Sequence, residues 1–166
     1  MNLQSIKYSS VIVALALTVV AVMLPRGALA IDIERVKSPG GIEAWLVRDT
    51  SVPVISFSFA FLGGASVDPA GREGRAELVS GVLDEGAGDM TSQVFQRAVE
   101  DIAARISFSS STDRFRGSLR TLAANRDEAF RLLTLAVNEP RFDITPVERI
   151  RAQMIAGLRS SLQNPN

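Results

Sequence analysis

The chain has 166 residues, a formal net charge of zero, and neither cysteine nor histidine. Without cysteine it has no disulfides and no thiolate ligands, and without histidine it has no histidine-based zinc site and no Ser-His-Asp triad. The balanced charge gives no indication of binding to nucleic acid. A chain of this length is expected to form one domain or part of a larger one.

The first thirty residues have the pattern of a secretory signal peptide. Lys7 precedes an almost wholly apolar run from Ser10 to Leu24, and Ala28-Leu29-Ala30 supplies small residues where a signal peptidase reads. We expect cleavage after Ala30, because the apolar run is short and ends at this A-x-A site. The product would be a periplasmic or secreted protein with no membrane contact after cleavage, and the absence of cysteine fits a bacterial periplasm. The alternative is an uncleaved anchor, although the run is shorter than the ~20 residues of a spanning helix.

Three strands are predicted next. Ile31–Val36 and Ile42–Val47 flank the turn Ser38-Pro39-Gly40-Gly41, which indicates a hairpin. Val54–Phe61 alternates strictly between apolar and small residues, as a half-buried strand does. The phenylalanines on its apolar face are Phe57, Phe59 and Phe61. We interpret this stripe as core rather than as a ligand pocket.

Helices and strands then alternate in pairs. Helical spacing of apolar residues predicts a helix from about Arg75 to Asp84, and another helix follows it. Strands are predicted over Arg105–Ser111 and Phe115–Leu122. In the first of these strands we place Ile106 and Phe108 on opposite faces.

Capping residues mark the starts of three helices. Thr91 is expected to begin the second helix, and Asn125 a helix that runs through Val137. Thr145-Pro146 combines an N-cap with proline at the first helical position and opens the last helix. The side chains expected to point inward from the helix after Asn125 are Ala129, Leu132, Leu133 and Ala136.

The order β β β α α β β α α indicates an α+β fold, with a largely antiparallel sheet packed against helices. The last predicted helix is followed only by a short polar tail. We therefore expect residues 31–166 to be one incomplete domain, truncated from a longer protein.

The segment Gly74–Gly86 resembles the zinc helix of the pitrilysin/insulinase family of zinc metallopeptidases. Further matching segments, in the family's order, are the early hairpin, the loop at Gly63-Gly64, the helix start Ala124–Ala129, the join Glu139–Phe142 and the helix end Gln163-Asn164-Pro165. The resemblance implies a LuxS/metallohydrolase-like α/β sandwich. It also implies that residues 31–166 are an insulinase-type N-terminal domain, about the first half of a family subunit.

The residues that define catalysis in this family are missing here. Its inverted motif H-x-x-E-H supplies two zinc ligands and a general base, whereas the matching positions are Glu77, Ser80 and Gly81. The third ligand, a glutamate, comes from the helix that is the last one here, and the matching stretch Gln153–Leu158 has no carboxylate. Catalytic zinc needs three protein ligands. We therefore predict no catalytic, metal-binding or cofactor-binding residues at these positions.

Two groups of charged residues have alternative interpretations. Glu77, Asp84 and Glu85 offer oxygen ligands, but Glu77 and Asp84 are two turns apart, ~10 Å along the helix axis, so we favour a solvated helix face and helix end. Arg72 and Arg75 flank the start of the same helix. They could contact an anion or a peptide carboxylate, but we favour ordinary surface residues.

The serine-rich strand is a candidate peptide-binding element. In active relatives the matching strand lies beside the zinc and receives the substrate as an added strand. Main-chain pairing needs no particular side chain, so it can outlast the chemistry. The candidate residues are Ser107, Phe108, Ser109 and Ser110. The alternative, which we favour, is a plain edge strand covered by a partner.

Three functions remain open on this sequence. Family members commonly work in pairs in which one subunit holds zinc, so the first is a non-catalytic subunit forming the chamber and peptide-binding wall of a heterodimeric periplasmic peptidase. Its partners would be an active zinc-peptidase homologue and peptides, with zinc only in that partner. The second is a free-standing peptide-binding or scaffold protein. The third is a metallopeptidase whose chemistry lies in a missing C-terminal part.

Overall fold

The computed structural model describes residues 32–163, and these form two units divided between Asp49 and Thr50. The predicted signal peptide, its cleavage site at Ala30 and the segment Asn164-Pro165 lie outside the described residues. Among the residues described, no helix has the length and apolar character needed to cross a membrane. The assignment of residues 31–166 to one domain stays a prediction.

The first unit contains the predicted hairpin. Strands β1 (Ile33–Lys37) and β2 (Glu43–Val47) pair antiparallel, with Ile33 opposite Val47. The turn closes through a hydrogen bond from the Ser38 amide to the Ile42 carbonyl at 2.8 Å, and the Ser38 hydroxyl accepts one from the Ile42 amide. Gly41 has a φ of 87°, a conformation that favours glycine. The sequence prediction for this hairpin is confirmed.

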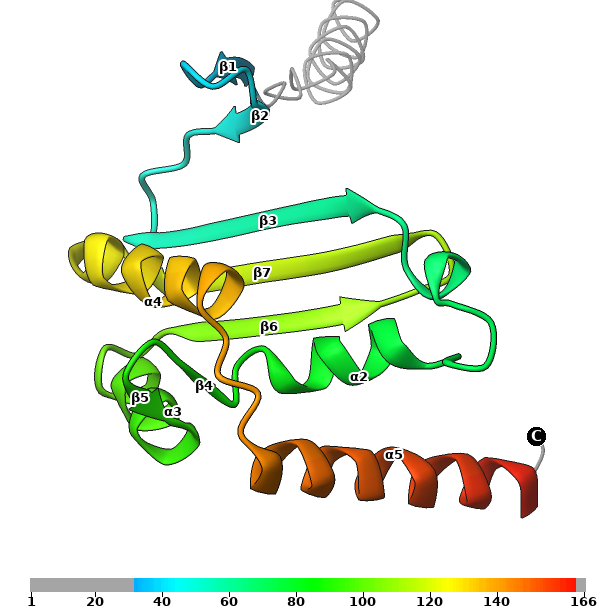
Figure 1. Cartoon of the computed structure of the whole chain (residues 1–166). Coiled ribbons are helices and arrows are strands. Elements are labelled where there is room, and N and C mark those ends of the chain that lie inside the picture. The colour runs from blue at the N-terminus through cyan, green and yellow to red at the C-terminus, as the bar shows by residue number, and fades with distance from the viewer. Residues whose placement is uncertain (1–31, 164–166) are drawn as a thin grey trace, which may run out of the picture. The chain divides into compact units, whose positions relative to one another are not determined.

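A three-stranded antiparallel sheet organises the second unit (Figure 1). Its order is β3 (Val54–Leu62), β7 (Arg114–Leu122) and β6 (Arg105–Ser110). The strands are in register so that Phe57, Leu119 and Ile106 form one row across the sheet. Because side chains alternate along a strand, each strand turns one set of residues to the helices and the other to the opposite face.

Helices follow the predicted order. They are α2 (Arg75–Val82), α3 (Ser92–Asp101), α4 (Arg126–Asn138) and α5 (Ile144–Gln163), with single 3-10 turns at Ala65–Val67 and Ala123–Asn125. A small hairpin of β4 (Gly86–Ala87) and β5 (Met90–Thr91) joins α2 to α3 and was not predicted. Helix α2 contacts both β6 and α5, and it lies between them (Figure 1).

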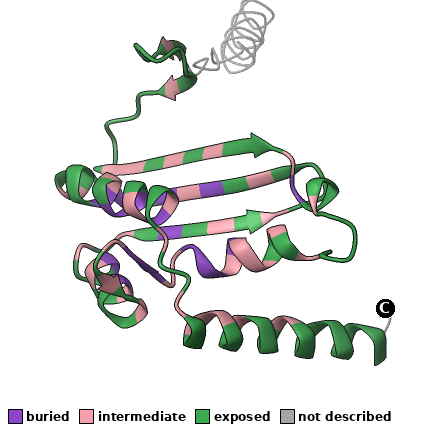
Figure 2. Cartoon of the chain, in the orientation of Figure 1, coloured by how far each residue is buried: buried purple, intermediate pink, exposed green. Residues whose placement is uncertain are grey.

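The core lies between one face of the sheet and helices α3 and α4. Its buried members are Ala87, Phe95, Val99, Ile106, Leu119, Ala129, Leu132, Leu133 and Ala136. All four residues predicted to point inward from α4 are among them. Figure 2 shows that burial is concentrated on these elements, whereas α5 is exposed or half-buried along its length. The α+β fold with an antiparallel sheet against helices is confirmed.

Three local predictions are wrong. Ile106 and Phe108 lie on the same face, because residues two apart in a strand point the same way. Ile106 belongs to the core, and Phe108 packs against it. Phe57 and Phe59 pack against the core, as predicted. Phe61 does not belong to the core and is 54% exposed. The last helix begins at Ile144, with the Asp143 carbonyl accepting from the Val147 amide, so Thr145 is not its N-cap.

Two predicted caps have the right position but not the predicted bond. Thr91 and Asn125 directly precede α3 and α4, and neither side chain makes a capping hydrogen bond. The side-chain amide of Asn125 instead donates to the main-chain carbonyl of Ile102 at 2.8 Å. It therefore satisfies the C-terminal end of α3 rather than the start of α4.

Candidate functional site

The positions matching the zinc motif lie on α2, whose start is held by a buried carboxylate. The side chain of Asp68 is 2% exposed, and its two oxygens accept from the amides of Gly74 and Ala76 at 2.9 and 3.0 Å. Backbone amides at a helix N-terminus have no acceptor within the helix, so the Asp68 carboxylate acts as an N-cap although it lies outside the helix. Gly74 has a φ of 89°, which a residue with a side chain rarely adopts. The sequence pattern does not predict this role of Asp68.

Glu77 and Ser80 do not converge on a common point. Ser80 is buried, and its hydroxyl donates to the carbonyl of Glu77 at 2.8 Å. This bond turns the serine back onto its own helix, as serine commonly does. The Glu77 residue is exposed. The remaining carboxylate and the residue at the general-base position therefore provide no shared site.

Gly81 fills the position of the second histidine of the motif, and the side chain of Ile150 closes the space around it. A Cβ atom added to Gly81 would lie 2.9 Å from Cγ2 of Ile150. The glycine thus lets α2 and α5 approach closely, and a histidine side chain would meet the isoleucine instead of open space. Helix packing has replaced a ligand position.

The stretch that matches the third ligand offers no oxygen donor of the required kind. Gln153 and Leu158 are exposed, and Met154 between them is half-buried. Within residues 32–163, no group of three or more histidine, cysteine, aspartate or glutamate side chains could hold a metal ion. The donor set and the closed space at Gly81 do not fit the zinc of the active family members, so no step of a zinc mechanism can be assigned to these residues.

Asp84 and Glu85, favoured above as part of a solvated helix face, lie in a partly buried charged cluster. The Glu85 side chain is 13% exposed and pairs with Arg149 of α5 at 2.6 Å. It also accepts a hydrogen bond from the Ser92 hydroxyl at 2.6 Å. Burial raises the pKa of the Asp84 carboxyl above its ordinary value of 3.8, and the charge of Glu85 adds to the rise. The interpretation of Glu85 as part of a solvated helix face is thus wrong.

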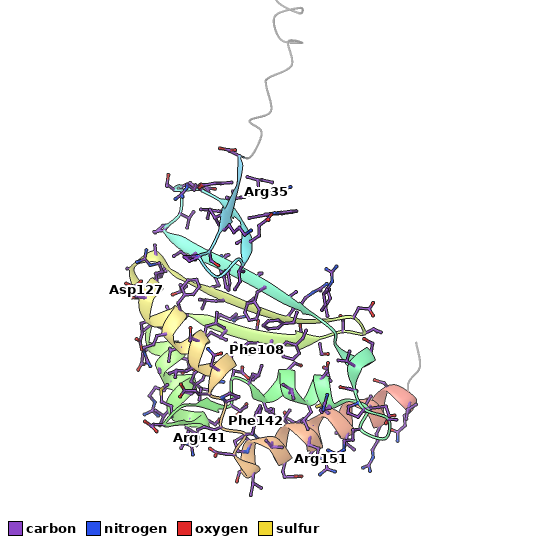
Figure 3. All side chains as sticks on the ribbon, turned by 45° about the horizontal axis from the view of Figure 1, so that its top comes forward. Arg35, Phe108, Asp127, Arg141, Phe142 and Arg151 are labelled. Atoms are coloured by element: carbon purple, nitrogen blue, oxygen red, sulfur yellow. The ribbon has the colours of Figure 1, made fainter. Side chains whose placement is uncertain are left out.

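Arg72 and Arg75 line a groove between the start of α2 and α5. The groove has a volume of about 470 Å³, and its apolar wall includes Leu78, Met154 and Leu158. Arg151 of α5 lines it as well (Figure 3). Arg75 also approaches Asp68, with 3.9 Å between Nε and Oδ1.

The serine-rich residues form strand β6 at one edge of the sheet. Ser107 and Ser109 are exposed, Phe108 points to the core, and the Ser107 hydroxyl lies 2.8 Å from that of Ser118 on β7. Among the described strands β6 pairs only with β7, and helix α2 contacts it. The structure does not test whether a peptide adds to this edge, and the binding role of Ser107–Ser110 stays a prediction.

Comparisons with known proteins relate the chain to one family. No protein-family model matches the sequence. The chain is 29% identical over 107 residues to the non-peptidase homolog YmxG of Helicobacter pylori (strain ATCC 700392 / 26695), an alignment that covers 64% of this chain and 25% of that protein. Its fold is similar to that of the peptidase M16 inactive domain of Pseudomonas fluorescens, with a TM-score of 0.75 and 26% identity over 81% of this chain and 33% of the other.

Two further solved structures share the fold. A protease from Helicobacter pylori has a TM-score of 0.63 and 19% identity, covering 78% of this chain and 31% of its own. Pitrilysin has a TM-score of 0.64 and 20% identity, covering 79% of this chain and 14% of its own. The chain spans about a quarter of the curated relative's length. Together with the motif positions on α2, these likenesses show that the chain is similar to non-catalytic relatives of the pitrilysin/insulinase (M16) peptidases, and that it lacks the zinc-binding residues of those peptidases at the matching positions.

Proposed function

We propose that the protein is a non-catalytic subunit that pairs with an active zinc-peptidase homologue in the periplasm and forms part of the chamber wall around peptides. The observation that carries this proposal is the contact between Gly81 and Ile150, which closes the position of a zinc ligand. Helices α2 and α5 pack together, which keeps the fold while giving up the chemistry.

The relatives support the coarse part of the proposal. One is described as a non-peptidase homolog and one as an inactive domain of an M16 peptidase. The pairing, the periplasmic location and the chamber wall are inferences that rest on the family resemblance and on the pattern of the first thirty residues. The exposed edge of β6 is the candidate for main-chain contact with a peptide.

Co-purification tests the proposal most directly. The full-length protein, expressed with its own signal peptide in its native host, would be isolated from the periplasm and its companions identified by mass spectrometry. We expect a second subunit of the same family with an intact H-x-x-E-H motif. We also expect the protein alone to contain no stoichiometric zinc and to have no chelator-sensitive peptidase activity. Stoichiometric zinc together with such activity in the isolated protein would overturn the proposal.

Other outcomes favour the alternatives. Recovery with bound peptides and no peptidase would favour the free-standing binding protein. A restored motif gives an independent check, using Glu77→His, Ser80→Glu and Gly81→His together. We expect this variant to remain without zinc, because Ile150 occupies the space beside residue 81 and the last helix supplies no third ligand. Zinc binding with the full affinity of an active family member would show that the site is intact apart from its side chains.

A further inference from the structure

The face of the three-stranded sheet that points away from the core carries four arginines and five serines, and the apolar pair Val54 and Leu122 lies at one end of it. The cross-strand register places Ser56, Arg120 and Arg105 in one row, followed by Ser58, Ser118 and Ser107, and then by Ala60, Arg116 and Ser109. Arg114 lies opposite Leu62 at the end of the sheet. We call the face formed by these eleven residues the arginine face. All four of its arginines are exposed.

Nothing on the arginine face balances its charge. Strands β3, β6 and β7 contain no aspartate or glutamate. None of the four arginines forms an ion pair with any residue in the described part of the chain. Elsewhere in residues 50–163, Arg72, Arg97 and Arg159 also form no ion pair. The arginines in ion pairs there are Arg75, Arg126, Arg131, Arg141, Arg149 and Arg151. The face therefore carries four positive charges in a protein whose formal net charge is zero.

One pair on this face lowers the stability of the sheet itself. Arg105 and Arg120 are direct cross-strand neighbours in the antiparallel pair β6–β7. Like charges in this arrangement are destabilising. A destabilising pair of this kind, with no acidic residue nearby on the sheet to offset it, is expected at a functional site. A negatively charged partner lying over both guanidinium groups would turn this repulsion into an attraction.

A shallow groove runs across the middle of the arginine face. It has a volume of about 260 Å³. The residues that line it are Ser58, Ser107, Ser109, Arg116 and Ser118 of this face, together with Phe59, Phe108 and Gly117, which alternate with them along the strands. Hydroxyl groups can donate to carboxylates and to main-chain carbonyls, and arginine can donate to a carboxylate in a bidentate manner. The groove thus places neutral donors between charged ones.

The spacing and chemistry of the face favour an extended polypeptide over a nucleic acid. Side chains on one face of a strand repeat every ~7 Å, and the alternate side chains of an extended peptide have the same repeat. Arg114, Arg116 and Arg120 occupy such alternate positions along β7. Proteins that bind single-stranded nucleic acid without sequence preference add aromatic side chains for base stacking. None of the eleven residues of the arginine face is aromatic, and Phe59 and Phe108, which also line the groove, pack against the core on the other face of the sheet.

We infer that the arginine face binds extended, acidic polypeptide segments, in which glutamate or aspartate side chains pair with Arg105, Arg116 and Arg120. This inference rests on the proposed function, because it names the class of peptide that the chamber wall would hold. The experiment below nevertheless uses the protein without any peptidase partner. A failed co-purification therefore leaves the inference intact, and a failed binding test leaves the proposed pairing intact.

The test is fluorescence anisotropy with the full-length protein and a labelled peptide of alternating glutamate and serine. Peptides of the same length with glutamine or lysine in place of glutamate serve as probes of charge, and an oligothymidine strand as a probe of nucleic-acid binding. We expect the glutamate peptide alone to bind, and to bind more weakly as salt is raised. Arg116→Gln with Arg120→Gln should weaken this binding about tenfold.

A matched control distinguishes binding at the arginine face from binding to positive charge elsewhere on the surface. Arg126→Gln with Arg131→Gln removes two exposed arginines of α4 that are in ion pairs, and it should leave peptide binding unchanged. Arg120→Gln also removes the repulsion with Arg105, so its thermal midpoint should be equal to or above that of the parent while binding falls. Equal binding of the glutamate and glutamine peptides, loss of binding in both double variants, or preference for oligothymidine would overturn the inference.

Discussion

Substitution of Gly81 by alanine tests whether α2 and α5 approach as closely as the structure indicates. In a helix interior this change alone favours the folded state by up to ~1 kcal/mol, because alanine has the better helix propensity. At Gly81, however, the new methyl group would lie 2.9 Å from Cγ2 of Ile150. That carbon belongs to a β-branched side chain with little rotational freedom. Overpacking of this kind typically costs ~1–3 kcal/mol.

Gly157 of α5 provides the matched control. Apart from its chain neighbours and the backbone of its own helix, no atom lies within 4 Å of the position that a Cβ would take there. Gly157→Ala should therefore stabilise the protein by up to ~1 kcal/mol. The difference between the two alanine variants removes helix propensity from the comparison and leaves the packing term, ~1–3 kcal/mol. Urea unfolding of the full-length protein, followed by circular dichroism, measures both free energies of unfolding.

A double-mutant cycle assigns the cost to one contact. Ile150→Ala removes Cγ2, so Gly81→Ala introduced into that background should become neutral or stabilising. The expected coupling energy lies within the ~0.5–3 kcal/mol found for residues in contact. If Gly81→Ala stabilises the parent as much as Gly157→Ala does, the two helices are not in close contact, and the argument that packing has closed the ligand position is refuted.

Three further predictions concern polar groups of the second unit. The hydroxyl of Thr121 is buried and has no hydrogen-bond partner among the described residues, so Thr121→Val should raise the free energy of unfolding by ~1 kcal/mol; no change in urea unfolding would show that the hydroxyl is satisfied. Asp68→Ala removes both acceptors for the amides at the start of α2 and should cost ~1 kcal/mol, whereas Glu73→Ala at an exposed position should cost less in the same assay. Burial raises the pKa of the Asp84 carboxyl. The folded state therefore binds the proton of this carboxyl more tightly than the unfolded state does. The free energy of unfolding consequently falls as pH rises from about 3.8 through the folded pKa. Asp84→Asn should therefore be more stable than the parent at pH 7, with a difference that shrinks toward pH 4 in thermal melts; a difference independent of pH would contradict this.

Local patterns were sufficient for most of the secondary structure. The alternation of Val54–Leu62 and the helical spacing around Leu132 are properties of consecutive residues, and the structure has the predicted strand and the predicted buried face. The short hairpin β4–β5 was missed because its strands have two residues each, too few for a period to show. The cap at Asp68 was missed because it acts on amides six and eight residues away.

The missing zinc ligands also follow from sequence alone. A chain without histidine cannot supply an H-x-x-E-H motif, whatever its fold. What only the tertiary structure decided are the relations between distant segments. Helix packing brings Ile150 against Gly81 and Arg149 against Glu85. Strand register places Arg105 opposite Arg120. No local pattern specifies these pairs, because each becomes a neighbour pair only when the burial of the whole core sets the register and the helix contacts.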